Sequence, residues 1–266
     1  MEHPEPPTID LVKSRKIAKI LFDAYSQKEG VFKQYQWPPE YNLPSGMRQG
    51  SEEQLLFSTL TVSLDYMRDA NKLWKQSHDA WINQQNRWIF NPKIVVEKQQ
   101  NSLIELFKNI NDQRPTKDAG IWFTICKELL KSDGSIYNLL KSLDFDAVKV
   151  SDYLDSNKKH FPYLGGYKIK PLWLRIINDT VGIQLKRIKE IPIPVDVHTA
   201  RVTLKLIFNE TLDGEITKEI RERTQRVWES ILEGTGIYPL QLDEPLWLLG
   251  KYELLNRFLQ EHNLCE

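Results

Sequence analysis

Two lysines follow a pair of glycines in the segment FPYLGGYKIKPLWLRIIND, and this combination could bind phosphate or supply a reactive amine. Gly165 and Gly166 separate two helical patterns, and glycine allows a backbone to approach a phosphate closely. Lys168 and Lys170 lie at the predicted start of the next helix. The positive end of a helix dipole and partial burial both favour a neutral amine, which is nucleophilic.

A single acid, Asp196, follows in the apolar segment IPIPVDVHTARV and is the second candidate for chemistry. Asp196 comes directly after Pro194 and Val195, where a helix is expected to begin, so it could be an N-cap. It could also be a catalytic carboxylate, and the two roles are compatible. His198 is either a surface or capping histidine or a phosphate contact.

The segments that must position these residues have the pattern of helices. Apolar residues recur at helical spacing, and no stretch shows the sustained alternation of a strand. We therefore expect an all-α fold with about ten helices. The predicted helices span residues 10–27, 51–74, 95–111, 116–131, 134–142, 146–157, 170–180, 196–208, 214–234 and 239–260.

The charge balance excludes a protein that holds nucleic acid by bulk attraction. The 266 residues include 36 Lys and Arg and 36 Asp and Glu, so the formal net charge is zero. The charge is unevenly distributed, since residues 158–189 hold eight basic residues against one acid, a net +7. Residues 210–244 carry a net −5. The basic segment suits phosphate binding, although it could also be a solvated helical face.

Several classes of protein are excluded by composition. Two cysteines, Cys126 and Cys265, cannot form a disulfide framework or a four-cysteine metal site. The start, MEHPEPPTID, is acidic and rich in proline, unlike a secretory signal. No apolar run approaches the roughly 20 residues of a membrane helix. We therefore expect a cytoplasmic protein with no membrane segment, metal or cofactor.

Three segments resemble the helix-hairpin-helix DNA glycosylases, and most closely the archaeal GO glycosylases, which excise 8-oxoguanine. The segments are IPIPVDVHTARVTLKLI at 191–207, RVWESILEGTGIYPLQLDEPLWLLGK at 226–251 and LTVSLDYMRDANKLW at 60–74. The hairpin tract at 163–180 fits more loosely, since it reads LGGYK in place of the common LPGVG. Together these segments cover about a third of the chain.

The resemblance implies a role for each matched residue. Lys170 matches the lysine that attacks the sugar C1′ and forms a Schiff base. Asp196 matches the aspartate that stabilises the developing sugar cation and activates the amine. Trp247 matches a tryptophan that stacks on the extruded base, and Asp243 an acid that hydrogen-bonds its guanine edge. Trp74 matches the second stacking tryptophan, although both tryptophans also fit core positions.

Other positions are expected to contact DNA. Gly165, Gly166 and Lys168 belong to the hairpin, and His198 matches a histidine that touches phosphate in the eukaryotic enzymes, which also read PVDVH. Lys168 competes with Lys170 for the role of nucleophile, and the hydrophobic pattern KPLWLRII favours Lys170. No cysteine cluster follows the hairpin, so the iron–sulfur cluster of other branches is excluded.

The resemblance also implies an architecture and an activity. Residues 1–266 would form a single catalytic unit, with one lobe at 51–195 that carries the hairpin at about 163–172. A second lobe would combine 1–50 with 196–266, and the active-site cleft would lie between the lobes. The predicted function is removal of a modified purine, 8-oxoguanine, with AP lyase activity, by a nucleoid-associated monomer on double-stranded DNA.

Two alternatives remain open from the sequence. The same fold could remove another damaged or hypermodified base, for example in phage DNA, and it could do so without lyase activity. Base choice depends on a few pocket residues, and the resemblance is partial. The chain could instead be a non-catalytic helix-hairpin-helix module, although the simultaneous presence of Lys170 and Asp196 argues against this.

Overall fold

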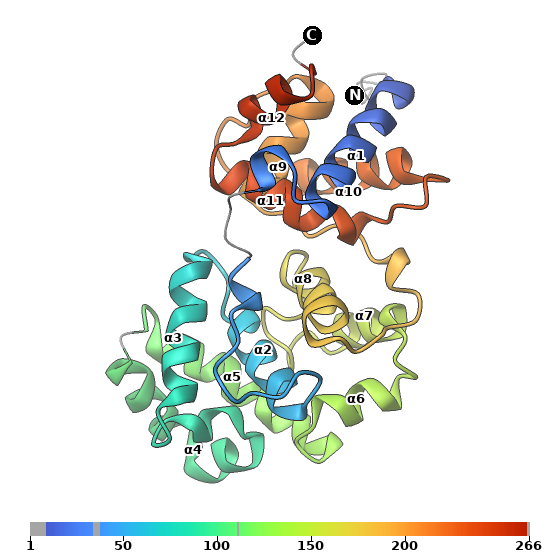
Figure 1. Ribbon diagram of the computed structural model, residues 1–266. Coiled ribbons are helices and arrows are strands. Elements are labelled where there is room, and N and C mark those ends of the chain that lie inside the picture. Colours follow the sequence, from blue (N-terminus) through green and yellow to red (C-terminus); the bar gives the residue numbers. More distant parts are fainter. Residues whose placement is uncertain (1–8, 34–37, 111, 265–266) are drawn as a thin grey trace, which may run out of the picture. The chain divides into compact units, whose positions relative to one another are not determined.

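The computed structural model describes residues 9–33, 38–110 and 112–264 (Figure 1). These residues contain twelve α-helices and no β-strand, which confirms the predicted all-α fold. No helix in this described part is both long and apolar enough to span a membrane.

The chain divides into two compact units. Unit 1 combines Met1–Gln36 with Lys189–Glu266, and unit 2 is the continuous segment Trp37–Ile188. The lobe boundaries that the resemblance implies, at residues 50 and 195, stay a prediction. The hairpin lysines belong to unit 2, whereas Asp196 belongs to unit 1.

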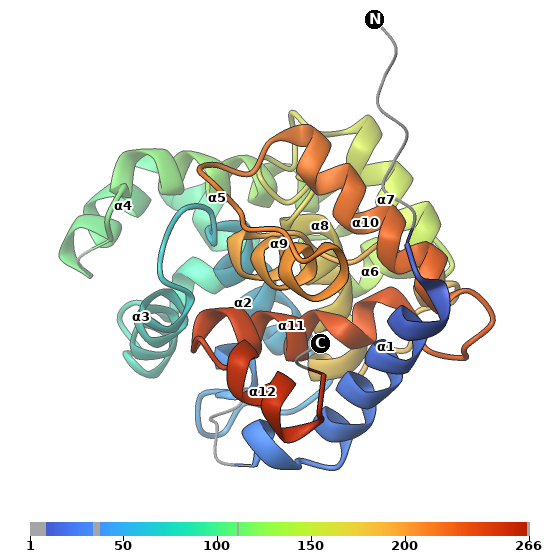
Figure 2. The same cartoon turned by 90° about the horizontal axis from the view of Figure 1, so that it is seen from above.

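Unit 2 is built around a central helix, α2. Every residue of α2 from Gln54 to Ser63 is buried, as expected for a helix that other helices surround. The buried Thr59 accepts a hydrogen bond of 2.9 Å from Nε1 of Trp173 and thereby joins α2 to α8. Helices α4 and α5 pack against each other (Figures 1 and 2). The helices of unit 2 are α2 (Glu52–Ser63), α3 (Ala70–Ile82), α4 (Pro92–Asn109), α5 (Pro115–Leu129), α6 (Ile136–Ser142), α7 (Ala147–Ser156) and α8 (Ile169–Arg175).

Unit 1 packs five helices around an apolar core. Helix α1 lies beside α10, and α9 lies against α11 (Figure 2). Leu21, Trp228, Leu249 and Phe258 are fully buried in this core. Trp228 donates a 2.8 Å hydrogen bond to Thr203, so its polar edge is satisfied. The helices of unit 1 are α1 (Leu11–Ser26), α9 (Val197–Thr203), α10 (Lys218–Leu232), α11 (Asp243–Lys251) and α12 (Leu255–Glu261).

Two predicted helices are wrong because each is divided into separate elements, and the predicted helix at 95–111 is kinked at Gln99, whose φ is 67°. The predicted helix at 51–74 breaks into α2 and α3, since Met67 has a positive φ of 53° and Asp69 caps α3 with its side chain. The predicted helix at 239–260 is a 3₁₀ turn followed by α11 and α12, and Glu253 at φ 56° separates these two helices. Apolar spacing continues through both breaks, so periodicity alone did not reveal them.

Candidate active site

The glycine hairpin is a tight turn that joins α7 to α8. The N–H of Gly165 donates to Phe161 O at 3.0 Å, and that of Gly166 to Tyr163 O at 2.7 Å. A Cβ atom at Gly165 would lie 3.2 Å from Leu154 O, and one at Gly166 only 2.9 Å from Tyr163 O. The turn therefore needs glycine at both positions, because a larger residue would collide with the backbone.

The hairpin is anchored on both of its sides. Phe161 and Leu164 are buried, while the Tyr163 ring stacks on the Tyr66 ring at 4.8 Å between centroids and 21° between planes. The Lys117 ammonium lies 5.3 Å from the centre of the Tyr163 ring. These contacts tie the hairpin to the turn that follows α2 and to α5.

Lys170, the predicted nucleophile, is held in an ion pair within the hairpin. Its Nζ lies 2.6 Å from Oδ2 of Asp155 on α7, and Lys158 approaches the other oxygen of that carboxylate at 3.2 Å. Partial burial opposes ionisation of Asp155, but the two lysines outweigh it and lower its pKa. Lys170 therefore cross-links the two helices of the hairpin through an ionised carboxylate.

Lys168 is paired with a different carboxylate. Its Nζ lies 3.2 Å from Oδ2 of Asp65 and 3.5 Å from the carbonyl oxygen of the same residue. The Asp65 side chain is only 5% exposed, compared with 43% for Asp155. The two hairpin lysines thus have partners in contrasting environments.

A buried ion cluster holds the turn that carries Asp65. Arg68 forms ion pairs with Asp112 at 3.3 Å and with Asp118, and all three side chains are almost fully buried. Arg114 donates a 2.8 Å hydrogen bond to the carbonyl oxygen of Tyr66. Burial and the neighbouring Asp112 raise the pKa of Asp118 to about 6, against the opposing effect of Arg68.

This raised pKa predicts a pH-dependent contribution to stability. Because the folded-state pKa of about 6 exceeds the ordinary 3.8, Asp118 stabilises the fold below pH 3.8, and this contribution is lost as the pH rises through 6. Asp118→Asn removes the titration. The unfolding free energy of the wild type, minus that of the variant, should fall between pH 4 and 7 by on the order of 3 kcal/mol at most. Urea unfolding at several pH values checks this, and a difference that increases with pH would contradict it.

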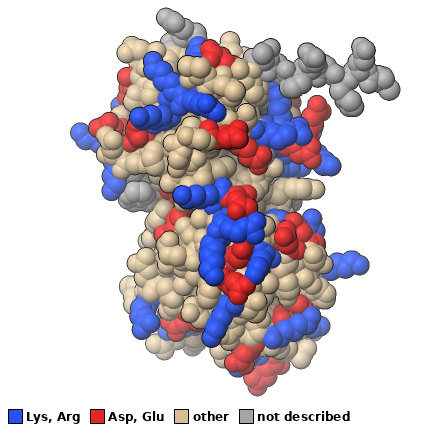
Figure 3. Space-filling view, turned by 90° about the vertical axis from the view of Figure 1, so that its right-hand side faces the viewer, with Lys and Arg blue, Asp and Glu red and all other residues tan. Residues whose placement is uncertain are grey.

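The segment with a net charge of +7 is less basic in the fold than in the sequence. Figure 3 shows Lys and Arg side chains interspersed with Asp and Glu on the face that it draws. Five of the eight basic residues of the segment pair with acids from outside it. The pairs are Lys158 and Lys170 with Asp155, Lys168 with Asp65, Arg175 with Glu40, and Arg187 with Asp146.

Asp196 caps the first turn of α9 in unit 1. Its Oδ1 accepts hydrogen bonds of 2.9 Å from the backbone N–H groups of His198 and Thr199, which confirms the capping role. Buried Ile193 and Val195 precede it and fix the entry of the chain. Within the described part of the chain, the second carboxylate oxygen accepts no hydrogen bond. Capping thus uses one oxygen and leaves the other for chemistry.

His198 is half-buried between α9 and α11. The backbone of His198 lies so close to Gly250 that a Cβ atom there would be 2.8 Å from His198 O. Its ring meets the Trp247 ring edge-on at 6.3 Å. Burial lowers the pKa of His198, with Lys251 acting in the same direction and Asp196 against it. The imidazole is therefore neutral at pH 7, so the predicted phosphate contact would be a hydrogen bond without an ion pair.

Asp243 and Trp247 lie on one face of α11. They are four residues apart, so their side chains are neighbours one turn from each other. Asp243 is buried, whereas Trp247 is partly exposed, with Tyr252 edge-on at 6.1 Å. An acid beside an accessible indole suits the predicted recognition of a flat base.

Trp74 has a different environment from Trp247. It lies on α3 in unit 2, is 5% exposed, and meets Phe57 edge-on at 5.9 Å. This burial supports the core role that the sequence left open. Its stacking role stays a prediction from the resemblance.

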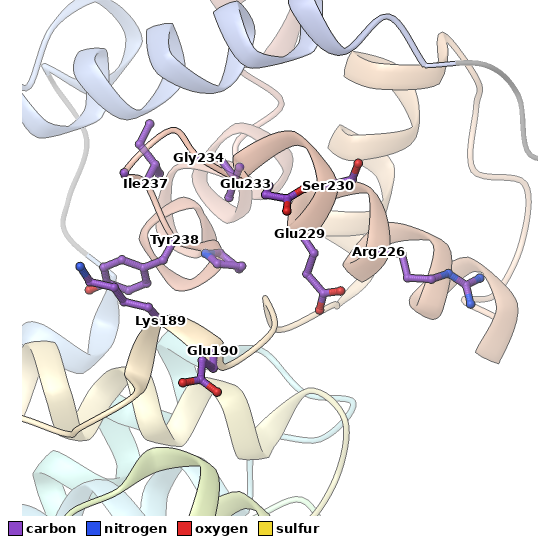
Figure 4. A pocket seen from close by; sticks show the side chains of 12 residues that line it. Lys189, Glu190, Arg226, Glu229, Ser230, Glu233, Gly234, Ile237 and Tyr238 are labelled. Carbon is purple, nitrogen blue, oxygen red and sulfur yellow. The ribbon is translucent and has the colours of Figure 1, made fainter.

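Unit 1 also has an open groove, which Figure 4 shows from close by. Its volume is about 660 Å³, and residues of α10 and of the turn after it line most of it. Both signs of charge are present, since Lys189 and Arg226 lie there with Glu229 and Glu233. Neither Asp196 nor the Asp243–Trp247 pair is among the lining residues. The groove is therefore separate from the predicted base pocket.

Comparisons with known proteins agree with this fold. Residues 172–265 match the AGOG family of N-glycosylase/DNA lyases. A 62-residue segment is 39% identical to an N-glycosylase/DNA lyase of Pyrobaculum aerophilum; it spans 23% of this chain and 24% of that protein. The chain thus matches about a quarter of the length of that curated relative.

The fold is similar over nearly the whole chain to that of a solved enzyme. The crystal structure of Methanocaldococcus jannaschii 8-oxoguanine glycosylase/lyase with a 15mer DNA containing 8-oxoguanine superposes with a TM-score of 0.52. The match covers 91% of this chain and 97% of that one at 14% identity. The chain therefore has the all-helical fold of this enzyme. The predicted resemblance to the archaeal GO glycosylases is confirmed.

Asp65 is the residue of the candidate site that sequence reasoning missed. It lies in LTVSLDYMRDANKLW, one of the three segments that resemble the glycosylases, but the resemblance implies no role for this aspartate. The sequence feature that could have indicated a role for Asp65 is the presence of an acid within the otherwise apolar run VSLDYM. Its partner, Lys168, is 103 residues away in sequence, and no local pattern links the two.

Proposed function

We propose that this protein is a DNA glycosylase that extrudes and excises a modified purine, 8-oxoguanine, from double-stranded DNA. We further propose that it cleaves the resulting abasic site by Schiff-base β-lyase chemistry. The match of residues 172–265 to the N-glycosylase/DNA lyase family carries the proposal. This region includes Asp196, Asp243 and Trp247, whose placement suits the chemistry, but neither hairpin lysine.

The first step of the reaction breaks the bond between the base and the sugar. As this bond weakens, positive charge develops on the sugar, and a carboxylate close to it lowers the barrier. Asp196 suits this role because its Oδ1 is fixed by two backbone N–H groups while its other oxygen stays available. A hairpin lysine attacks C1′ as a neutral amine and forms the covalent intermediate.

Residues of α11 recognise the extruded base. The Trp247 ring offers an apolar face on which an extruded base stacks. The Asp243 carboxylate, one turn away, accepts hydrogen bonds from the N–H groups of a guanine edge. An adenine edge presents a different set of donors and acceptors, so the acid favours a guanine-type base.

Lyase chemistry follows from the covalent intermediate. Once the sugar ring has opened, C1′ is joined to lysine as an iminium ion, which makes the C2′ hydrogens acidic. Loss of one such proton expels the 3′ phosphate and cleaves the strand. Hydrolysis of the remaining imine then frees the lysine.

Release of a free base from defined duplexes tests the proposal. The protein is incubated with duplexes that each carry one modified base, and with an unmodified duplex as control, and mass spectrometry identifies any released base. We expect 8-oxoguanine from its duplex and nothing from the control. Release of only a different base would replace the substrate, and DNA binding without any release would support a non-catalytic module.

A further inference from the structure

The two hairpin lysines differ in the solvent exposure of their carboxylate partners. The Lys170 partner, Asp155, is 43% exposed and is also paired with Lys158. Lys170 thus shares an exposed carboxylate with a second lysine, and this pair joins α8 to α7. Lys168 has the more exposed side chain of the two lysines, at 29% against 15%.

Asp65 has an unsatisfied atom of a kind that is uncommon in folded proteins. Its Oδ2 pairs with Lys168, while its Oδ1 is buried and, within the described residues, has no hydrogen-bond partner. A buried carboxylate with an orphaned oxygen pays a desolvation penalty as an anion. The Oδ2 of Asp65 lies 3.2 Å from Nζ of Lys168, which is within reach for a proton transfer between the two groups.

The surroundings of Asp65 hold it in place. Its own N–H donates to Val62 O at 3.0 Å and extends the end of α2. The next residue, Tyr66, is fixed by its stack on Tyr163 and by the hydrogen bond from Arg114 to its carbonyl oxygen. Because Tyr163 belongs to the hairpin, the turn and the hairpin are mutually fixed. Asp65 and Lys168 are therefore kept together by more than their own ion pair.

We propose that Lys168 is the lysine that forms the Schiff base and that Asp65 is its positioning residue and proton acceptor. This inference rests on the proposed glycosylase/lyase function and assigns Lys170 a structural role in the hairpin. It departs from the expectation that the hydrophobic pattern KPLWLRII favours Lys170.

The proton balance of the step is as follows. One N–H bond of the Lys168 ammonium breaks as an O–H bond forms on Asp65, which leaves a neutral amine. The N–C1′ bond then forms while the C1′–N9 bond breaks, and its electron pair leaves with the base, which takes a proton from solvent. The new secondary ammonium loses one proton to the ring oxygen O4′ as the ring opens, and the iminium ion results.

Borohydride trapping separates the two lysines. The full-length protein is incubated with an 8-oxoguanine duplex and sodium borohydride, which reduces the Schiff base to a stable cross-link. Lys168→Arg keeps a cation beside Asp65 but cannot form a Schiff base, so we expect folded protein and no cross-link. Lys170→Gln is the matched variant and should still be trapped. Trapping of Lys168→Arg, or loss of trapping in a folded Lys170→Gln, would overturn the assignment.

The role of Asp65 is tested by measuring the rate of base release and the affinity for the duplex separately. Asp65→Asn keeps the shape of the side chain but cannot accept the proton, so the single-turnover rate of base release should fall about 100-fold. The affinity for the duplex should be unchanged, and Asp65→Glu should restore part of the rate. An unchanged rate in folded Asp65→Asn overturns the role of Asp65. If the wild type releases no base and is trapped on no duplex, the proposed function fails, and this inference fails with it.

Discussion

Replacement of Asp196 by asparagine should nearly abolish base release while leaving α9 intact. Asparagine caps helices about as well as aspartate, so the hydrogen bonds to the His198 and Thr199 N–H groups can be kept. The variant loses the negative charge that stabilises the developing sugar cation in the proposed mechanism. The single-turnover rate of base release should fall by about 10²- to 10⁴-fold, with an unchanged melting temperature.

Asp196→Ala is the control for the capping role. It removes both the charge and the cap, so it should lose the same activity and also about 1 kcal/mol of stability. The pair of variants thus separates capping from catalysis. A rate for Asp196→Asn close to that of the wild type would mean that Asp196 is a helix cap alone.

Truncation of the two predicted stacking tryptophans should have different effects, on DNA binding for Trp247 and on stability for Trp74. Trp247 is partly exposed, so Trp247→Ala should weaken binding of an 8-oxoguanine duplex by about 1–3 kcal/mol, which is the value of one stacked base. Binding of an undamaged duplex should not change, because no base is extruded there. Competition binding with the two duplexes measures the difference, and Trp247→Phe should retain much of the preference.

Trp74→Ala should act on stability. Trp74 is 5% exposed and packed on Phe57, so removal of its side chain should cost about 3–5 kcal/mol of unfolding free energy. Denaturant unfolding of both alanine variants gives this comparison. A Trp74→Ala protein of wild-type stability that had lost its preference for damaged DNA would instead place Trp74 in the base pocket.

Local sequence patterns predicted the elements of the fold that depend on neighbouring residues. The aspartate in PVDVH was expected to be a cap, and its side chain does accept the first N–H groups of α9. The helix predicted at 10–27 is observed at Leu11–Ser26, with Asp10 as its cap. Both features depend on side chains within a few residues of each other, which a single sequence displays directly.

The break between α2 and α3 could not be predicted from hydrophobic spacing. Leu64, Met67 and Leu73 continue the helical period across it, yet Met67 is 81% exposed and has left-handed backbone geometry. The turn is stabilised by the ion pairs of Arg68 with Asp112 and Asp118 and by the hydrogen bond from Arg114 to Tyr66 O, and each of these contacts joins residues more than 40 positions apart. Tertiary contacts thus override the local pattern at this position.

The partners of the hairpin lysines were equally hidden from the sequence. Lys170 meets Asp155 from the preceding helix, and Lys168 meets Asp65 from a segment 103 residues earlier. The segment 158–189 therefore has a net charge of +7 in the sequence, whereas the fold places acids beside most of its basic residues. The choice between the lysines depended on burial of their partners, which only the structure supplies.

Identification of the lysine that becomes attached to DNA is the decisive test of the proposed mechanism. Wild-type protein is trapped with borohydride on an 8-oxoguanine duplex, digested with nuclease and protease, and the modified peptide is sequenced by mass spectrometry. We expect a sugar remnant on Lys168, together with free 8-oxoguanine in solution. A remnant on Lys170 would contradict the assignment of the nucleophile, and the absence of both adduct and released base would contradict the glycosylase/lyase function itself.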